Sequence, residues 1–64
     1  MTPSELRSAR LALGLSVERF AALPWRNGRI AASGRTVRRW ERGMLDIPIG
    51  LDAYVRALLA RRVV

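Results

Sequence analysis

The stretch of sequence that decides the fold runs from Ser33 to Gly43 and spells SGRTVRRWERG. Ser33 is a good N-cap and Gly43 supplies a left-handed stop, so the stretch predicts one short helix. Val37 and Trp40 share one face of that helix. The opposite face carries Arg35, Arg38, Arg39 and Arg42. We therefore expect a helix that is held from behind by bulky apolar side chains and directs long cationic side chains outward.

Two helices are expected before this stretch. A capping box at Thr2 to Glu5 and a left-handed stop at Gly14 bound a first helix over residues 3–13. Ser16 is a good N-cap for a second helix of about two turns, which Pro24 ends. Both helices are amphipathic, so they predict a shared apolar core with the third.

A fourth helix is expected over about residues 50–62. Its apolar residues recur at i, i+3, i+4, i+7 and i+8, and they are Leu51, Tyr54, Val55, Leu58 and Leu59. No segment shows a convincing alternation with a period of two, so we expect an all-α fold of four compact helices. The length of 64 residues leaves room for a single domain, residues 1–64.

Charge is the strongest signal in the composition. Twelve arginines, with no lysine, stand against five acids, which gives a net charge of +7 and a pI near 11.9. This pI exceeds the value of about 9 that is typical of nucleic-acid-binding domains. The guanidinium fork suits phosphate oxygens and the guanine edge, although an arginine-rich composition without lysine also arises from coding bias.

The composition argues against catalysis. The chain contains no histidine and no cysteine, the usual base and nucleophile, and it is too short to enclose a ligand pocket easily. We therefore expect no enzyme activity, no cofactor, no metal and no small-molecule ligand. The longest apolar run, residues 20–25, is too short to span a membrane. Residues 1–7 lack the features of a secretory signal, so we expect a cytoplasmic protein.

Two short helices followed by a third with a basic outer face are typical of helix-turn-helix DNA recognition. In that arrangement the third helix enters the major groove and offers long donors to the base edges. The alternative is a solvated charged face on a structural helix. Four arginines between residues 35 and 42, with no acid on the same face, favour DNA binding.

Two motifs resemble a known family. The segment RLALGLS at residues 10–16, followed by the stretch at 33–43, resembles the lambda-repressor-like helix-turn-helix domains of the Cro and xenobiotic-response-element type. The resemblance extends from Thr2 to about Leu59 and includes Ile47–Pro48 before an amphipathic helix. Small phage-borne members, including regulators of anti-CRISPR operons, have similar lengths and endings.

The resemblance implies residues that contact DNA. The positions that face base edges are Ser33, Gly34, Arg35 and Arg39, with Gly34 acting only through its backbone. The positions directed toward phosphates are Arg38 and Arg42. For Arg39, a salt bridge to a neighbouring acid is the structural alternative. A bidentate arginine on guanine contributes about 1 to 3 kcal/mol of discrimination, so each half of the site should contain a G.

The resemblance also implies a structural ion pair. Arg10 and Glu41 match a pair that ties the first helix to the recognition helix in similar domains. If the pair is buried, removal of one partner costs roughly 3 to 5 kcal/mol. Trp40 is expected in the core, because its spacing from Val37 places it on the apolar face, and base stacking is the alternative.

Two departures from the family pattern stand out. Val17 occupies a position that is usually Gln, so only the amino end of the second helix is left to meet a phosphate there. Residues 24–29 form a six-residue insertion between the second and third helices, with a turn signal at Asn27–Gly28. In this loop we expect Trp25 to cover the core edge or to reach DNA. The loop also offers Arg26 and Arg29 as phosphate contacts.

The fourth helix has a broader apolar face than three helices would cover. We therefore expect a homodimer, with Tyr54, Val55, Leu58 and Val63 as candidate interface residues. Two recognition helices would then bind an inverted-repeat operator on double-stranded DNA. The expected function is repression of a small operon, which includes autorepression as one possibility. The alternatives are an antitoxin-like regulator, a protein-interaction module that binds an acidic partner, and a cationic membrane-surface peptide.

Overall fold

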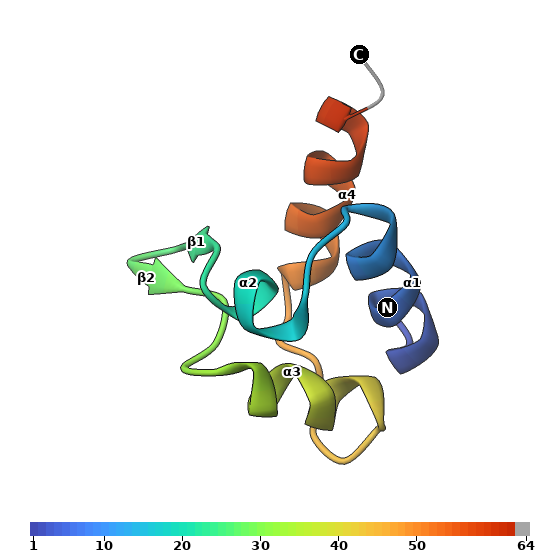
Figure 1. The fold of residues 1–64 in the computed structure, drawn as a ribbon, viewed down its shortest axis with the longest axis vertical. Coiled ribbons are helices and arrows are strands. Elements are labelled where there is room, and N and C mark those ends of the chain that lie inside the picture. The colour runs from blue at the N-terminus through green and yellow to red at the C-terminus, as the bar shows by residue number, and fades with distance from the viewer. Residues whose placement is uncertain (63–64) are drawn as a thin grey trace.

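The computed structural model describes residues 1–62 as four helices and a short hairpin (Figure 1). The elements in chain order are α1 (Pro3–Ala12), α2 (Val17–Ala21), β1 (Pro24–Trp25), β2 (Gly28–Arg29), α3 (Gly34–Glu41) and α4 (Leu51–Arg62). α3 packs against α2 and α1, and α1 also packs against α4. The hairpin projects from the side of α2 that lies away from α1 (Figure 1). The fold is therefore mostly helical, but the prediction of an all-α chain is wrong for the insertion.

Local signals set the ends of α1, which begins at Pro3 as predicted and ends at Ala12, one residue earlier than predicted. The Thr2 hydroxyl accepts a hydrogen bond from the Glu5 N–H at 3.1 Å, and Glu5 Oε1 accepts one from the Thr2 N–H at 2.7 Å. At the other end Gly14 has a φ of +71°, and the Leu15 N–H donates to the Arg10 carbonyl at 3.2 Å. This pattern of bonds is a Schellman ending, which satisfies carbonyls that the last turn leaves open.

α2 is shorter than the two turns expected from the sequence. Ser16 Oγ accepts from the Arg19 N–H at 3.2 Å and begins the helix, which ends at Ala21. The chain that returns from the hairpin pairs with this end of α2. The Ile30 N–H donates to the Leu23 carbonyl and the Ala31 N–H to the Ala21 carbonyl, both at 3.0 Å. These bonds hold the residues after the hairpin next to the carboxyl-terminal end of α2. The insertion therefore protrudes from the fold, and α2 and α3 stay packed together.

The insertion forms an antiparallel two-stranded sheet. Pro24 pairs with Arg29 and Trp25 with Gly28, so the connecting residues are Arg26 and Asn27. The turn lies one residue earlier than the Asn27–Gly28 signal indicated, and Arg26 takes the left-handed φ of +55°. Strands of two residues are too short to show a period of two, which explains why the sequence did not predict them.

The hairpin covers one edge of the core. Trp25 is half-buried against the core, and its ring centroid lies 6.2 Å from that of Tyr54. The Tyr54 hydroxyl donates a hydrogen bond to the Pro24 carbonyl. Trp25 therefore covers the core edge, which was the first of the two expectations for it.

The core takes at least one side chain from each helix. The side chains that are completely buried are Leu6 of α1, Phe20 of α2, Val37 of α3, and Leu51 and Val55 of α4. Trp40 is only 5% exposed. Trp40 is thus a core residue, and a base-stacking role for it is excluded by its burial.

The structure rules out one of the candidate dimer residues on α4, Val55, and the dimer itself stays a prediction. Val55 is fully buried within its own chain, and the Tyr54 hydroxyl is hydrogen-bonded to the Pro24 carbonyl of the hairpin. Leu58 is half-buried, and Val63 lies outside the described residues. Large apolar side chains are exposed elsewhere, at Leu11, Met44, Leu45 and Ile49. Among residues 1–62, no helix is both long and apolar enough to cross a membrane.

Candidate nucleic-acid interface

α3 presents one cationic face to solvent. We call the four exposed arginines on α3 and at its C-cap, Arg35, Arg38, Arg39 and Arg42, the arginine face. On the opposite side of the helix, Val37 and Trp40 are buried, so the rotation of α3 about its own axis is fixed. Within residues 1–62 none of the four arginines forms an ion pair, and this includes Arg39, for which a salt bridge was the alternative. The four charges are therefore available to an anion.

The arginine face borders an open groove of about 460 Å³. The residues that line it are Glu18, Arg35, Arg38, Arg39, Arg42 and Met44. Its lining carries four arginines and one carboxylate, so the groove has a strong positive charge. Arg35 and Arg39 are one helical turn apart, which aligns their guanidinium groups along the helix axis.

Glu18 of α2 is a site residue that the sequence did not reveal. Its Oε2 accepts a hydrogen bond from the Gly34 N–H at 3.1 Å, so the carboxylate caps the amino end of α3. A Cβ on Gly34 would lie 2.6 Å from Glu18 Oε1 and 2.9 Å from the Glu18 backbone nitrogen. Glycine at this position therefore allows α2 and α3 to approach each other closely.

This contact changes the expectations for Ser33 and Gly34. Gly34 is buried and its N–H is already bonded, so the structure does not support a role for its backbone at a base edge. Ser33 occupies the N-cap position, but its side chain forms no capping bond because Glu18 does so instead. The Ser33 hydroxyl is exposed beside the arginine face and stays a candidate for base contact.

Arg10 and Glu41 form the ion pair that the resemblance implied. Arg10 Nε donates to Glu41 Oε2 at 2.7 Å, and Arg10 Nη2 donates to Glu41 Oε1 at 3.1 Å. The two side chains are only 11% and 9% exposed. Arg10 Nη1 also donates to the Leu15 carbonyl at 2.9 Å. The bidentate pair ties α1 to the last turn of α3.

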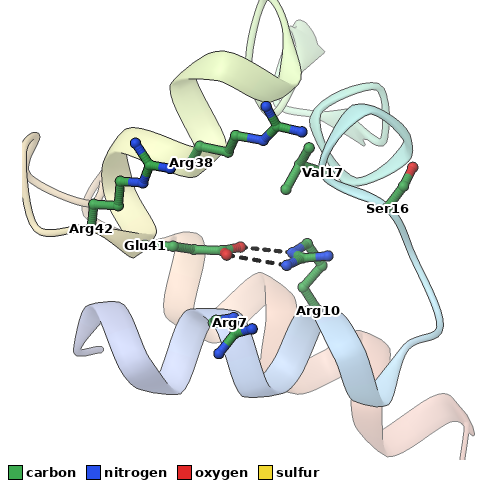
Figure 2. A pocket seen from close by; sticks show the side chains of 7 residues that line it. All are labelled: Arg7, Arg10, Ser16, Val17, Arg38, Glu41 and Arg42. Carbon is green, nitrogen blue, oxygen red and sulfur yellow. Dashed lines mark hydrogen bonds and ion pairs between the residues drawn. The ribbon is translucent and has the colours of Figure 1, made fainter.

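A second hollow, of about 420 Å³, lies between α1, the start of α2 and α3 (Figure 2). We call it the arginine pocket, and its lining residues are Arg7, Arg10, Ser16, Val17, Arg38, Glu41 and Arg42. Figure 2 shows the Arg10–Glu41 pair at its centre, with Arg38 and Arg42 extending from α3 on one side and Arg7 on α1 on the other. Val17, Arg38 and Arg42 are thus brought together as predicted, and Arg7 joins them without having been predicted.

The predicted phosphate contacts in the insertion are separate from this pocket. The Arg26 guanidinium lies 4.1 Å from the centroid of the Trp25 ring, and Arg26 Nη2 donates to the Ile49 carbonyl at 2.6 Å. These contacts tie the hairpin to the loop before α4, so the structure does not support Arg26 as a phosphate contact. Arg29 is exposed on β2 but lines neither the groove nor the pocket.

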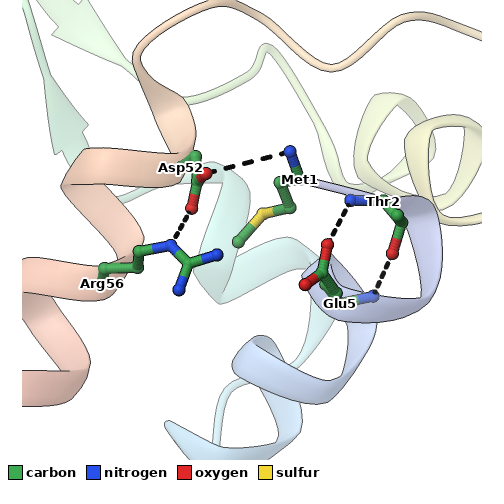
Figure 3. Close-up of polar contacts among 5 residues, drawn as sticks. All are labelled: Met1, Thr2, Glu5, Asp52 and Arg56. Carbon is green, nitrogen blue, oxygen red and sulfur yellow. Dashed lines mark hydrogen bonds and ion pairs between the residues drawn. The ribbon is translucent and has the colours of Figure 1, made fainter.

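A separate cluster of charges joins the amino end of the chain to α4 (Figure 3). The Met1 amino group lies 3.8 Å from Asp52 Oδ2, and Arg56 Nε donates to Asp52 Oδ1. The hydrogen bond to Asp52 raises the pKa of Arg56 above its ordinary value. The bond from the Thr2 N–H is the main reason that the pKa of Glu5 lies below its ordinary value. This cluster is structural, because both of its cations are paired with Asp52 and it lies apart from the arginine face.

Comparison with protein-family models, with curated proteins and with solved structures finds no match for this chain. The arginine face, the groove and the arginine pocket are therefore the features that indicate a function.

Proposed function

We propose that the chain is a sequence-specific transcriptional regulator that binds double-stranded DNA through a helix-turn-helix unit. α2 and α3 form the unit, and α3 is the recognition helix. The observation that carries the proposal is the arginine face: four exposed arginines that form no ion pair within residues 1–62, on a helix whose other side is fixed by buried Val37 and Trp40. A helix held in this way can enter a major groove without losing core contacts.

Arg35 and Arg39 are the proposed base-reading residues. They border the same groove and lie one turn apart, so both can face the floor of a major groove. The guanidinium fork donates two hydrogen bonds to O6 and N7 of one guanine, which provides about 1 to 3 kcal/mol of discrimination against another base. Ser33, at the amino end of α3, is placed to contact a flanking base or phosphate.

Arg38 and Arg42 are the proposed phosphate contacts. They lie on the flank of α3 that borders both the groove and the arginine pocket. Contacts to phosphate position a protein on the duplex but carry no direct sequence information. The two pairs of arginines thus have different roles. Arg35 and Arg39 select the sequence, and Arg38 and Arg42 set the position of α3 on the duplex.

Two copies of the chain are part of the proposal. α3 has eight residues and is therefore about 12 Å long, which covers only about three or four base pairs. So short a sequence does not define a unique site. A symmetric pair on an inverted repeat, with half-sites about 34 to 36 Å apart, doubles the sequence that is read. Such a dimer near a promoter would block polymerase, and repression of a small operon is the biological role we propose.

Salt titration of binding to defined duplexes tests this function. For a DNA regulator, the logarithm of the observed association constant falls linearly with the logarithm of the salt concentration, with a slope of about −0.9 per phosphate contacted. Such a regulator also prefers one sequence. Arg35→Ala should reduce the preference for that sequence, whereas Arg42→Ala should weaken binding to every duplex alike. Arg61→Ala, at an exposed position on α4, is the matched control and should change neither the sequence preference nor the affinity for DNA.

Two outcomes would contradict the proposal. Equal affinity for all duplexes would favour a module that binds an acidic protein partner through charge alone. Uniform loss of affinity in both Arg35→Ala and Arg42→Ala would show that the division between base and phosphate contacts is wrong.

A further inference from the structure

Arg7 of α1 has no role in the interactions described so far. It is exposed, yet it lines the arginine pocket together with Arg38 and Arg42 of α3 (Figure 2). Within residues 1–62 these three arginines form no ion pair. Three unpaired cations around one hollow repel one another, and an anion between them removes that repulsion.

The other charged groups of the pocket are already satisfied. Arg10 uses Nε and Nη2 on Glu41, and Nη1 on the Leu15 carbonyl. Glu41 therefore has a cation of its own and does not neutralise the other arginines. The net charge that faces a ligand comes from Arg7, Arg38 and Arg42, and it is close to three positive charges.

The chemistry of the pocket favours a phosphate group. Arginine forks match phosphate oxygens through paired hydrogen bonds, and three forks can share the oxygens of one tetrahedral group. Ser16 and Val17, at the start of α2, line another wall of the pocket, and both are small residues that leave the space open. Arg7, Arg38 and Arg42 are exposed, so the hollow is open to solvent and suits a phosphate that is attached to a long chain.

The amino end of α3 does not compete for this anion. The Glu18 carboxylate already caps it through the Gly34 N–H. A phosphate therefore gains little at that helix end, and the three arginine charges make the arginine pocket the more favourable place for it.

We propose that Arg7, Arg38 and Arg42 clamp one backbone phosphate of the DNA in the arginine pocket, so that α1 as well as α3 contacts the duplex. The inference rests on the proposed function and extends it by one residue and one contact. A clamp supplied from two helices fixes the angle of α3 in the groove, because α1 and α3 are themselves tied by the Arg10–Glu41 pair.

The test is Arg7→Gln, with Arg61→Gln as the matched control for charge on an exposed helix surface. Binding of the full chain to its preferred duplex is measured by fluorescence anisotropy between about 50 and 200 mM salt. The symmetric dimer loses one phosphate contact in each protomer, which makes the salt slope shallower by about 1.8, so the advantage of the wild type over Arg7→Gln shrinks about 12-fold across this range. Arg61→Gln should keep the wild-type slope. Arg7→Lys keeps the charge and should restore most of the slope, which separates the contact from any effect on folding.

Duplexes with a single neutral methylphosphonate locate the contact. At one position on each strand, the substitution should weaken the wild type but cause no further loss in Arg7→Gln. A titration with inorganic phosphate alone, followed through the arginine Nε–H signals by NMR, distinguishes a free phosphate from one in the DNA backbone.

The outcomes distinguish a failure of the proposed clamp from a failure of the proposed function. If the wild type prefers one duplex and Arg7→Gln has the same salt slope as Arg61→Gln, the clamp is wrong and the proposed function stands. The pocket binds free phosphate if the Arg7 Nε–H signal shifts with inorganic phosphate while Arg7→Gln leaves the affinity for DNA unchanged. In that case the assignment of the pocket to a phosphate of the DNA backbone is wrong. If the wild type binds no duplex preferentially, the proposed function fails and the clamp fails with it.

Discussion

The Arg10–Glu41 pair allows a prediction with a definite sign and magnitude. The perturbations are Glu41→Met, Arg10→Met and the double variant, since methionine keeps much of the side-chain volume without charge. Both side chains are about nine-tenths buried and are joined by two hydrogen bonds. Removal of one partner from a buried pair costs about 3 to 5 kcal/mol, because the other charge is left without compensation.

The two single variants should differ. Glu41→Met leaves Arg10 surrounded by the other cations of the arginine pocket, so it should cost about 3 kcal/mol. Arg10→Met leaves Glu41 beside Arg38 and Arg42, which line the same pocket and can partly neutralise it. This loss should be smaller, about 1 to 2 kcal/mol below that of Glu41→Met. The double variant should regain most of the stability, because an apolar contact can replace a buried pair.

The assay is thermal and urea unfolding followed by circular dichroism. A domain of this size has about 3 to 10 kcal/mol of stability in total. A loss of 3 kcal/mol should therefore lower the melting temperature by about 12 to 24 °C. The reasoning would be refuted if Glu41→Met unfolds within about 0.5 kcal/mol of the wild type, or if the losses of the two single variants simply add in the double variant.

Three further predictions concern other contacts. Gly34→Ala should cost about 1 to 3 kcal/mol, because its Cβ would lie 2.9 Å from the Glu18 backbone nitrogen, whereas Gly28→Ala, where a Cβ meets nothing within 4 Å, should be nearly neutral in urea unfolding. Tyr54→Phe removes the hydrogen bond to the hairpin and should cost about 1 kcal/mol in thermal melting without altering affinity for DNA, and a loss of affinity would place the hairpin at the interface. The pKa of Glu5 is lowered in the folded state, so its stabilising effect is present above the ordinary value of 4.5 and is lost as the pH falls through the folded-state value. The melting temperatures of wild type and Glu5→Gln should therefore converge at acidic pH, and a constant difference would show that the cap does not depend on the charge.

The helix ends could be predicted because their signals are local. The capping box at the start of α1 and the glycine stops at Gly14 and Gly43 depend only on residues within one turn. The arginine face could be predicted equally well, since the spacing of Val37 and Trp40 fixes which side of α3 is buried. Such features follow from the sequence because helical geometry alone places the side chains.

The features that were missed depend on how the elements meet. Glu18 at the start of α2 resembles an ordinary favourable charge in a first helical turn, and only the angle between α2 and α3 brings it to Gly34. Arg7 resembles a solvated surface charge until α3 packs across α1. Val55 was assigned to a dimer because an apolar stripe does not say whether its partner belongs to the same chain, and here it does.

Selection of bound sites from a pool of random duplexes, carried out in parallel with the wild type and Arg35→Ala, tests the central claim most directly. The claim is that side chains on the exposed face of α3 read the bases. The wild type should enrich an inverted repeat with at least one G in each half and about 10 base pairs between half-site centres. Arg35→Ala should keep the spacing but lose the preference for G at one position in each half. Enrichment of no sequence by the wild type, or of the same sequence by both proteins, would contradict the claim.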